Sequence, residues 1–238
     1  MPDPQLQLFI AQRQAFLDVL DRKDGRDRII DDLSELAFDA FEQVLEAWSR
    51  DLPPLDCHKG CSPCCILRVV ATAPEILVLA HFIRTHIEPD EAADLIRRIR
   101  EADAITNGLG EAERMAARQP CPFVIGGVCV IYPVRPLACR GHAAFDAKAC
   151  AQAAKGRDVD IPISEPHLMA RSFIQNPLHA ALFARNLAWG AYELNQALLI
   201  ALADDTAADR WLAGEDVFRD ALAKDMPMAE MAQAFRQM

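Results

Sequence analysis

The chain has 238 residues, of which 52% are hydrophobic and 25% charged, and its formal net charge is -10. This apolar content excludes a mainly disordered chain, and the length allows roughly 70% of the unfolded surface to be buried without disulfide bonds. The acidic balance argues against nonspecific nucleic-acid binding, because the phosphates would be repelled. The low aromatic fraction of 7% favours helices over a β-sandwich.

Apolar residues recur at helical spacing in the first fifty residues. They predict amphipathic helices over 4–20 and 29–48, separated by the charged segment 21–27. Pro53 and Pro54 then open an irregular segment.

A capping box marks the next helix. Thr72 is followed three residues later by Glu75, and Pro74 lies in the first turn. The helix is expected to reach about Ile87. Two more helices are expected, from Pro89 to about residue 107 and over 111–118.

The segment after Pro120 has a different pattern. Two β-prone runs, 123–125 and 128–132, flank Gly126 and Gly127 and predict a hairpin. Pro133 and Pro136 prevent a strand from continuing beyond it.

The rest of the chain is helical in pattern. A helix over 167–174 is expected to break at Asn176-Pro177, a long helix to follow over 178–203, and two short helices over 207–238. The predicted fold class is mainly α: a helical domain with a small irregular Cys-rich insert that contains a short β-hairpin. We expect one domain over 1–238, with N-terminal helices in 1–52, a cysteine-cluster metal-binding region in 53–155 and C-terminal helices in 156–238.

Eight cysteines fall within the middle of the chain and none in either flank. They are Cys57, Cys61, Cys64, Cys65, Cys121, Cys129, Cys139 and Cys150. The first residues lack the pattern of a secretory signal, and no apolar stretch reaches the roughly 18 residues that span a membrane. A cytoplasmic location is therefore expected. Clustered thiols that stay reduced there indicate metal or redox chemistry.

The first cluster, Cys57 to Cys65, has the short spacings that direct several sulfurs toward one point. Gly60 and Pro63 favour turns within it. Thiolates select zinc, copper(I) or iron–sulfur clusters over magnesium or calcium. Cys64 and Cys65 are adjacent, so either one binds while the other packs, or they serve two centres.

The second cluster consists of Cys121, Cys129 and Cys139. A two-residue turn at Gly126-Gly127 would place Cys121 and Cys129 on opposite faces of the hairpin. We therefore expect either a bulge or a Cys121 that lies outside the ladder, since Pro122 weakens pairing there. The two clusters can form one site of three or four thiolates, or two such sites.

Other residues near the cysteines have weaker cases. His58 and His142 could bind a metal, but a loop histidine is the simpler interpretation. Cys150 is as well explained by helix packing as by ligation. Arg135 and Arg140 either offset thiolate charge or are solvated surface charges, and both interpretations stay open.

The cysteine spacing, together with Cys121-Pro122-Phe123, Ile131-Tyr132 and Arg135-Pro136-x2-Cys139-Arg140, resembles the YkgJ-type cysteine-cluster proteins over residues 55 to 155. That family is described as a zinc- or iron-chelating domain with a CxxCxxCC-like signature. The flagellin lysine N-methylase, thought to use an iron–sulfur centre, looks like a distant relative in this pattern. The resemblance implies metal binding by the cysteines and no settled reaction.

Three functions remain as hypotheses. The first is a protein that binds zinc or iron, as an ion or an iron–sulfur cluster, through Cys57, Cys61, Cys64, Cys65, Cys121, Cys129 and Cys139. The second is a metalloenzyme with an open position on the metal for redox or group-transfer chemistry, although the radical S-adenosylmethionine spacing of Cys57, Cys61 and Cys64 lacks the expected α/β pattern. The third is a copper or zinc carrier or sensor. The expected partner is a metal ion, with no nucleic acid and no membrane, and no catalytic residue is assigned.

Overall fold

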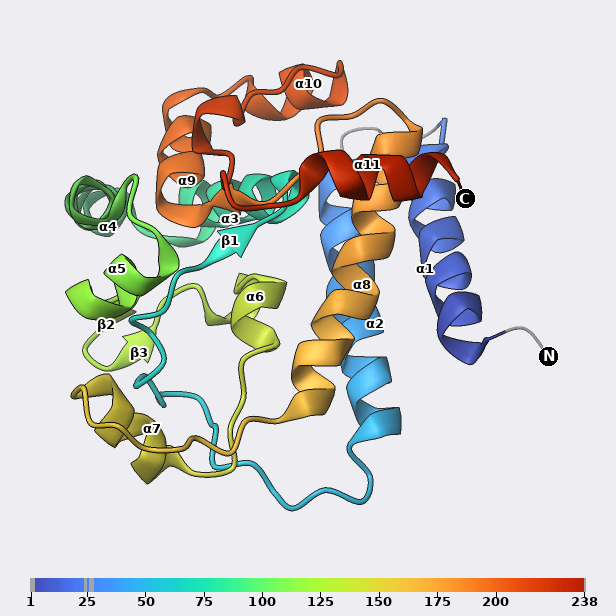
Figure 1. The fold of residues 1–238 in the computed structure, drawn as a ribbon. Coiled ribbons are helices and arrows are strands. Elements are labelled where there is room, and N and C mark those ends of the chain that lie inside the picture. Colours follow the sequence, from blue (N-terminus) through green and yellow to red (C-terminus); the bar gives the residue numbers. More distant parts are fainter. Residues whose placement is uncertain (1–2, 24, 26–27, 238) are drawn as a thin grey trace.

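The computed structural model describes residues 3–23, 25 and 28–237, and helices make up most of this part of the chain (Figure 1). The predicted mainly α class is therefore confirmed. The helices are α1 (Pro4–Leu20), α2 (Ile29–Trp48), α3 (Ala73–His86), α4 (Pro89–Thr106), α5 (Glu111–Ala117), α6 (Leu137–Arg140), α7 (Ala147–Ala154), α8 (Glu165–Ala184), α9 (Leu194–Ala203), α10 (Ala207–Leu212) and α11 (Met228–Arg236). Two 3-10 helices, η2 (Tyr132–Val134) and η3 (Arg219–Ala221), accompany them.

Helices α1, α2 and α8 lie side by side on one side of the molecule (Figure 1). Their facing sides are apolar, and Phe16, Leu33 and Ile174 are fully buried between them. Burial of each such side chain stabilises the fold by about 2 kcal/mol. A second layer of α3, α4 and α9 continues this core, because α3 packs against both α2 and α9.

Two short antiparallel strand pairs connect distant parts of the chain. Strand β1 (Val70–Ala71) pairs with β4 (Tyr192–Glu193), in the register Val70 to Glu193. The predicted hairpin is formed by β2 (Val124–Ile125) and β3 (Val128–Cys129), with Val124 opposite Cys129. It is shorter than the expected runs, because Tyr132 already belongs to the 3-10 helix that Pro133 favours.

Several boundaries follow from local sequence signals. Helices α1 and α2 have the predicted limits, and Glu75 caps α3 by accepting hydrogen bonds from the Thr72 amide and hydroxyl at 2.8 and 2.7 Å. In the expected break at 21–27, Gly25 has a φ of 74°. Residues 24, 26 and 27 of that break lie outside the described part of the chain.

Two predicted boundaries are wrong. Helix α8 continues through Pro177, and the expected long helix over 178–203 is divided by residues 185–193. Pro177 lacks the amide that would bond to the previous turn, yet Ile174 and Leu178 on either side are buried against neighbouring helices, and this packing keeps α8 intact. The chain turns later, where Asn186 and Gly190 have positive φ angles of 54° and 142°.

No helix in the described residues combines the length and the apolar character needed to cross a membrane.

Candidate metal centre

The first cysteine cluster lies in the irregular segment between α2 and β1, which runs along one edge of the molecule (Figure 1). Tight turns shape it. The amide of Cys61 donates to the carbonyl of His58 at 3.0 Å, and the amide of Cys65 donates to that of Ser62 at 3.0 Å. Gly60 has a φ of 95°, which only glycine adopts readily, so the first turn depends on it. These turns bend the short stretch of chain that carries the sulfurs of the first cluster.

The second cluster is tied to the first by the backbone. The amide of Cys121 donates to the carbonyl of Cys65 at 2.7 Å, just before the hairpin begins. Gly126 and Gly127 form a two-residue turn with φ of 57° and 81°, so the turn has no bulge. Cys121 instead lies outside the ladder, which is the second of the two arrangements that the sequence left open.

Cys139 lies on the short helix α6. The start of this helix is held by Glu75, whose second carboxylate oxygen accepts a hydrogen bond from the Leu137 amide at 2.6 Å. Glu75 is 1% exposed, so one buried carboxylate joins the first turn of α3 to the helix that carries Cys139.

Cys57 contacts the segment between α6 and α8, and Cys150 lies within that segment. The sulfur of Cys57 accepts a hydrogen bond from the Ala144 amide at 3.3 Å, and the neighbouring Asp56 accepts one from the Ala147 amide at 3.1 Å. Cys150 lies on α7, whose first turn is capped by Asp146. The chain before the first cluster is thereby attached to the helix that carries the last cysteine.

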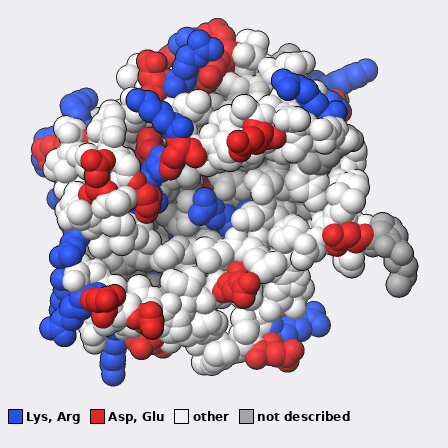
Figure 2. Space-filling view, in the orientation of Figure 1, with Lys and Arg blue, Asp and Glu red and all other residues white. Residues whose placement is uncertain are grey.

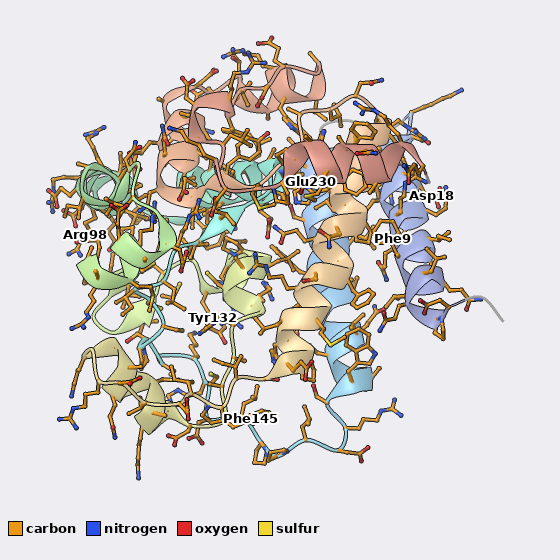
Figure 3. All side chains as sticks on the ribbon, viewed as in Figure 1. Phe9, Asp18, Arg98, Tyr132, Phe145 and Glu230 are labelled. Carbon is orange, nitrogen blue, oxygen red and sulfur yellow. The ribbon has the colours of Figure 1, made fainter. Side chains whose placement is uncertain are left out.

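Seven of the eight cysteines line one cavity of about 710 Å³, and Cys150 does not. They are Cys57, Cys61, Cys64, Cys65, Cys121, Cys129 and Cys139. Every residue in the predicted ligand set therefore faces this cavity. Tyr132, which lies between the hairpin and α6, marks its position in Figure 3.

The electrostatic neighbours of each thiol divide the cysteines into two groups. The sulfurs of Cys139, Cys129 and Cys64 raise the pKa of Cys121, and those of Cys129 and Cys64 raise the pKa of Cys139. Burial raises the pKa of Cys61 and of Cys150, and the sulfurs of Cys57 and Cys64 are the next largest causes. We name Cys64, Cys65, Cys121, Cys129 and Cys139 the inner group, and Cys57, Cys61 and Cys150 the outer group.

Four of the inner thiols, Cys64, Cys121, Cys129 and Cys139, lie in an environment that raises their pKa. Burial raises the pKa of Cys121 and of Cys139 to about 12, and neighbouring sulfurs add to the effect. A hydrogen bond with Cys65, followed by burial, raises the pKa of Cys64 strongly. Metal binding must therefore displace protons from these sulfurs.

Two backbone amides oppose this effect. The amide of Phe123 hydrogen-bonds to the sulfur of Cys121, and the amide of Ile131 to that of Cys129; each lowers the pKa of its thiol. A donor aimed at sulfur stabilises the thiolate form, which is the form that binds metal. The chemistry of this donor set therefore fits zinc or iron held by thiolates.

The two arginines that the sequence left undecided behave differently. The charge of Arg135 lowers the pKa of Cys64, Cys129 and Cys139, so its guanidinium lies at the inner group. Its Cζ lies 4.2 Å from the centre of the Tyr132 ring, and its buried Nε has no hydrogen-bond partner among the described residues. Arg140 instead pairs with Glu42 at 3.2 Å.

Three other charged or titratable residues line this cavity: Arg171 and His167, which no local pattern marked, and Arg68, which lies close to the first cluster in sequence. Arg171 and His167 come from α8, far from the cysteines in sequence. The Nε of Arg68 donates a hydrogen bond of 2.8 Å to the carboxylate of Glu193. The same carboxylate accepts a hydrogen bond of 2.8 Å from Arg114. No local spacing signals such contacts, because they depend on how α5, α8 and β4 pack. The predicted candidate His142 lines the cavity, and His58, also in its lining, is exposed and bonds to the Lys59 carbonyl at 3.0 Å.

The sulfurs share a cavity without yet surrounding a single point. Within the described part of the chain, no three His, Cys, Asp or Glu side chains are arranged as a bound ion requires. Binding of a metal by three or more of these cysteines would therefore require their side chains to change rotamer.

Comparison with known proteins identifies one family. Residues 56–156 match the CxxCxxCC family, described as "Putative zinc- or iron-chelating domain". No curated protein and no solved structure matches the chain. The matched segment begins one residue before Cys57 and includes all eight cysteines. Over residues 56–156 this chain is therefore similar to the CxxCxxCC family.

Proposed function

We propose that this protein binds one zinc or iron centre through the inner group, with the sulfurs of Cys64, Cys121, Cys129 and Cys139 as ligands. The observation that carries the proposal is that these four thiols, from three separate segments, line the same cavity and influence one another's pKa. Four thiolates suit tetrahedral zinc, mononuclear iron and iron–sulfur clusters alike.

The remaining cysteines have supporting positions in this proposal. Cys65 hydrogen-bonds to the Cys64 side chain and provides the carbonyl that holds Cys121. The outer group lies beside Cys64, with Cys57 fixed by Ala144. We propose that the outer thiols border the centre and do not bind it in the resting state.

Arg135 provides the charge balance that four thiolates need. Four thiolates around a divalent ion leave a net charge of about -2, and a nearby guanidinium with a free buried donor reduces this excess. The metal would also join the irregular segment to the hairpin and α6, so part of the folding free energy would come from binding.

Metal analysis tests the proposal. The protein is purified without oxygen, and zinc, iron and acid-labile sulfide are measured per chain together with the visible absorption spectrum. We expect one centre per chain: one zinc with no visible absorption, one iron without sulfide, or a brown protein whose iron and sulfide match one cluster. A chain that contains neither metal, and takes up neither on titration under reducing conditions, would contradict the proposal. Two centres per chain would contradict the supporting role of the outer group.

A further inference from the structure

The cavity is far larger than one metal ion requires. A water molecule takes up about 30 Å³ of liquid, and the cavity measures about 710 Å³. This volume falls among the sites that hold small organic molecules, which span about 300–1,000 Å³. A metal centre at the inner group leaves most of this space for something else.

Two arginines in the lining of the cavity have no acidic partner. Within residues 3–23, 25 and 28–237, no carboxylate lies within 4.0 Å of Arg135 or Arg171. The other two arginines of the lining are paired, Arg68 with Glu193 and Arg140 with Glu42. In a chain of net charge -10, two unpaired guanidinium groups at one cavity indicate a site for an anion.

Arg171 is held in place by two contacts that leave its outer nitrogens free for a ligand. Its Nε donates to the Gln175 side chain at 3.2 Å. Its stem lies against Gly141, where an added Cβ would meet the Cβ of Arg171 at 2.7 Å and its Cδ at 3.0 Å. Gly141 has no positive φ, so the close approach of this side chain is what requires glycine there.

Two carboxylates, Glu111 and Asp225, also line the cavity; Asp225 pairs with Arg68, and neither lies within 4.0 Å of Arg135 or Arg171. His142 and His167 also line the cavity, and burial lowers the pKa of each imidazole. The charge of Arg171 adds to this effect at His142, whereas at His167 the Glu42 carboxylate opposes it and Arg135 adds to it. In Figure 2, basic side-chain surface lies in the hollow near the centre of the face, among mostly uncharged residues. Apolar side chains, including Ile131, Leu168 and Met226, complete the lining.

We propose that the cavity binds a small organic anion beside the metal centre. The anionic group, a carboxylate or a phosphate, is held by the guanidinium groups of Arg171 and Arg135, and the apolar lining holds the organic part. Guanidinium forms paired hydrogen bonds with both kinds of anion. Arg135 also belongs to the proposed metal function, so the site is tested at Arg171, which has no atom that binds metal.

Calorimetric titration with three aromatic probes tests the site on the full chain as purified. Benzoate and phenyl phosphate carry the two kinds of anionic group, and benzamide is a neutral match for benzoate. We expect at least one anion to bind and benzamide not to bind, and the preferred anion identifies the ligand class. Equal binding of all three probes, or binding of none at millimolar concentration, would overturn the proposal.

Variants assign the binding to the residues named. Arg171→Gln is expected to weaken binding of the preferred anion about tenfold or more, since it removes a charged hydrogen-bond donor pair. Gly141→Ala is expected to weaken it as well, because the added methyl group displaces Arg171. Arg97→Gln, an equal change of charge on exposed α4, is the control and should bind as the wild type does.

Metal content and melting temperature are measured for each variant. A folded Arg171→Gln protein that keeps its metal and binds the anion as the wild type does would contradict the anion site alone. A metal-free wild type that still binds the anion through Arg171 would leave the anion site standing and contradict only the metal proposal.

Discussion

The amide of Cys121 donates a hydrogen bond of 2.7 Å to the carbonyl of Cys65, although helices α3, α4 and α5 lie between them in the chain. This contact brings the second cysteine cluster to the first before any metal is bound. Folding of the chain therefore already covers part of the entropic cost of bringing the two clusters together. A metal would have to order mainly side chains.

The division into inner and outer groups predicts different effects of two serine substitutions. Cys139→Ser is expected to lose at least half of the bound metal, because it removes a proposed ligand. Cys150→Ser is expected to keep nearly all of it, since Cys150 lies outside the lining of the cavity. Metal per chain is measured for both variants by mass spectrometry on protein purified without oxygen. Equal losses in the two variants would show that the outer group also binds.

The contacts of Glu75 predict that a small chemical change at this residue lowers the stability of the fold by a large amount. Its carboxylate accepts hydrogen bonds from Thr72 and from the Leu137 amide, and it is buried. In Glu75→Gln the side-chain NH2 group replaces one acceptor oxygen, so a buried donor loses its partner. We expect the free energy of unfolding to fall by about 2 kcal/mol.

Urea denaturation measures this loss. Glu91→Gln, on the exposed start of α4, is the matched control and should change the stability by less than about 0.5 kcal/mol. If the two variants unfold at the same urea concentration, Glu75 does not connect α3 to α6 as described.

The structural features that could be predicted from the sequence are those that depend on residues close together along the chain. The stripe of apolar residues in α2 and the pair Thr72 and Glu75 are local signals, and the helices follow them. Pro177 is also a local signal, but it was misleading, because the burial of Ile174 and Leu178 outweighs one missing hydrogen bond.

In the candidate site, too, local signals identified some features, and others depend on how the chain packs. Thiolate chemistry and spacing identified the cysteines, and the structure places seven of them at one cavity. The role of Arg171 could not be predicted, because it depends on α8 crossing beside Gly141. The choice between a bulge and an unpaired Cys121 likewise depended on contacts with Cys65 that no local pattern shows.

The contacts of Glu193 predict that the cysteine-containing region and the C-terminal helices are held together by charge. Its carboxylate lies between Arg68 and Arg114, and all three side chains are at most 15% exposed. Glu193→Gln leaves Arg114 without an acidic partner within the described residues. We expect a loss of about 3 kcal/mol in the free energy of unfolding, as for other buried ion pairs that lose one member.

The control for this change is Glu101→Gln, which removes an exposed ion pair with Arg97 on α4. It should cost less than about 1 kcal/mol. Both variants are compared by urea denaturation, and a loss in Glu193→Gln no larger than in the control would show that the network adds no stability.

His179 predicts a pH dependence of stability that is independent of the metal centre. It is 1% exposed, and neither ring nitrogen has a hydrogen-bond partner in the described part of the chain. Burial, with the charge of Arg171 adding to it, lowers the pKa of this imidazole to about 4. The unfolded chain takes up the proton near pH 6.5, whereas the folded protein takes it up only near pH 4. The free energy of unfolding therefore falls as the pH drops through this window, by up to about 3 kcal/mol for this residue.

Urea denaturation at several pH values between 7.5 and 4.5 measures this dependence against His179→Leu, which cannot be protonated. The variant is expected to lose stability less steeply than the wild type below pH 6.5, and to be no less stable than the wild type at pH 5, because a buried polar group without partners has been removed. His81→Leu, on the exposed side of α3, should follow the wild-type curve. Parallel curves for His179→Leu and the wild type would mean that His179 takes up its proton equally well in the folded and unfolded chain, and its burial would then not be what limits stability in acid.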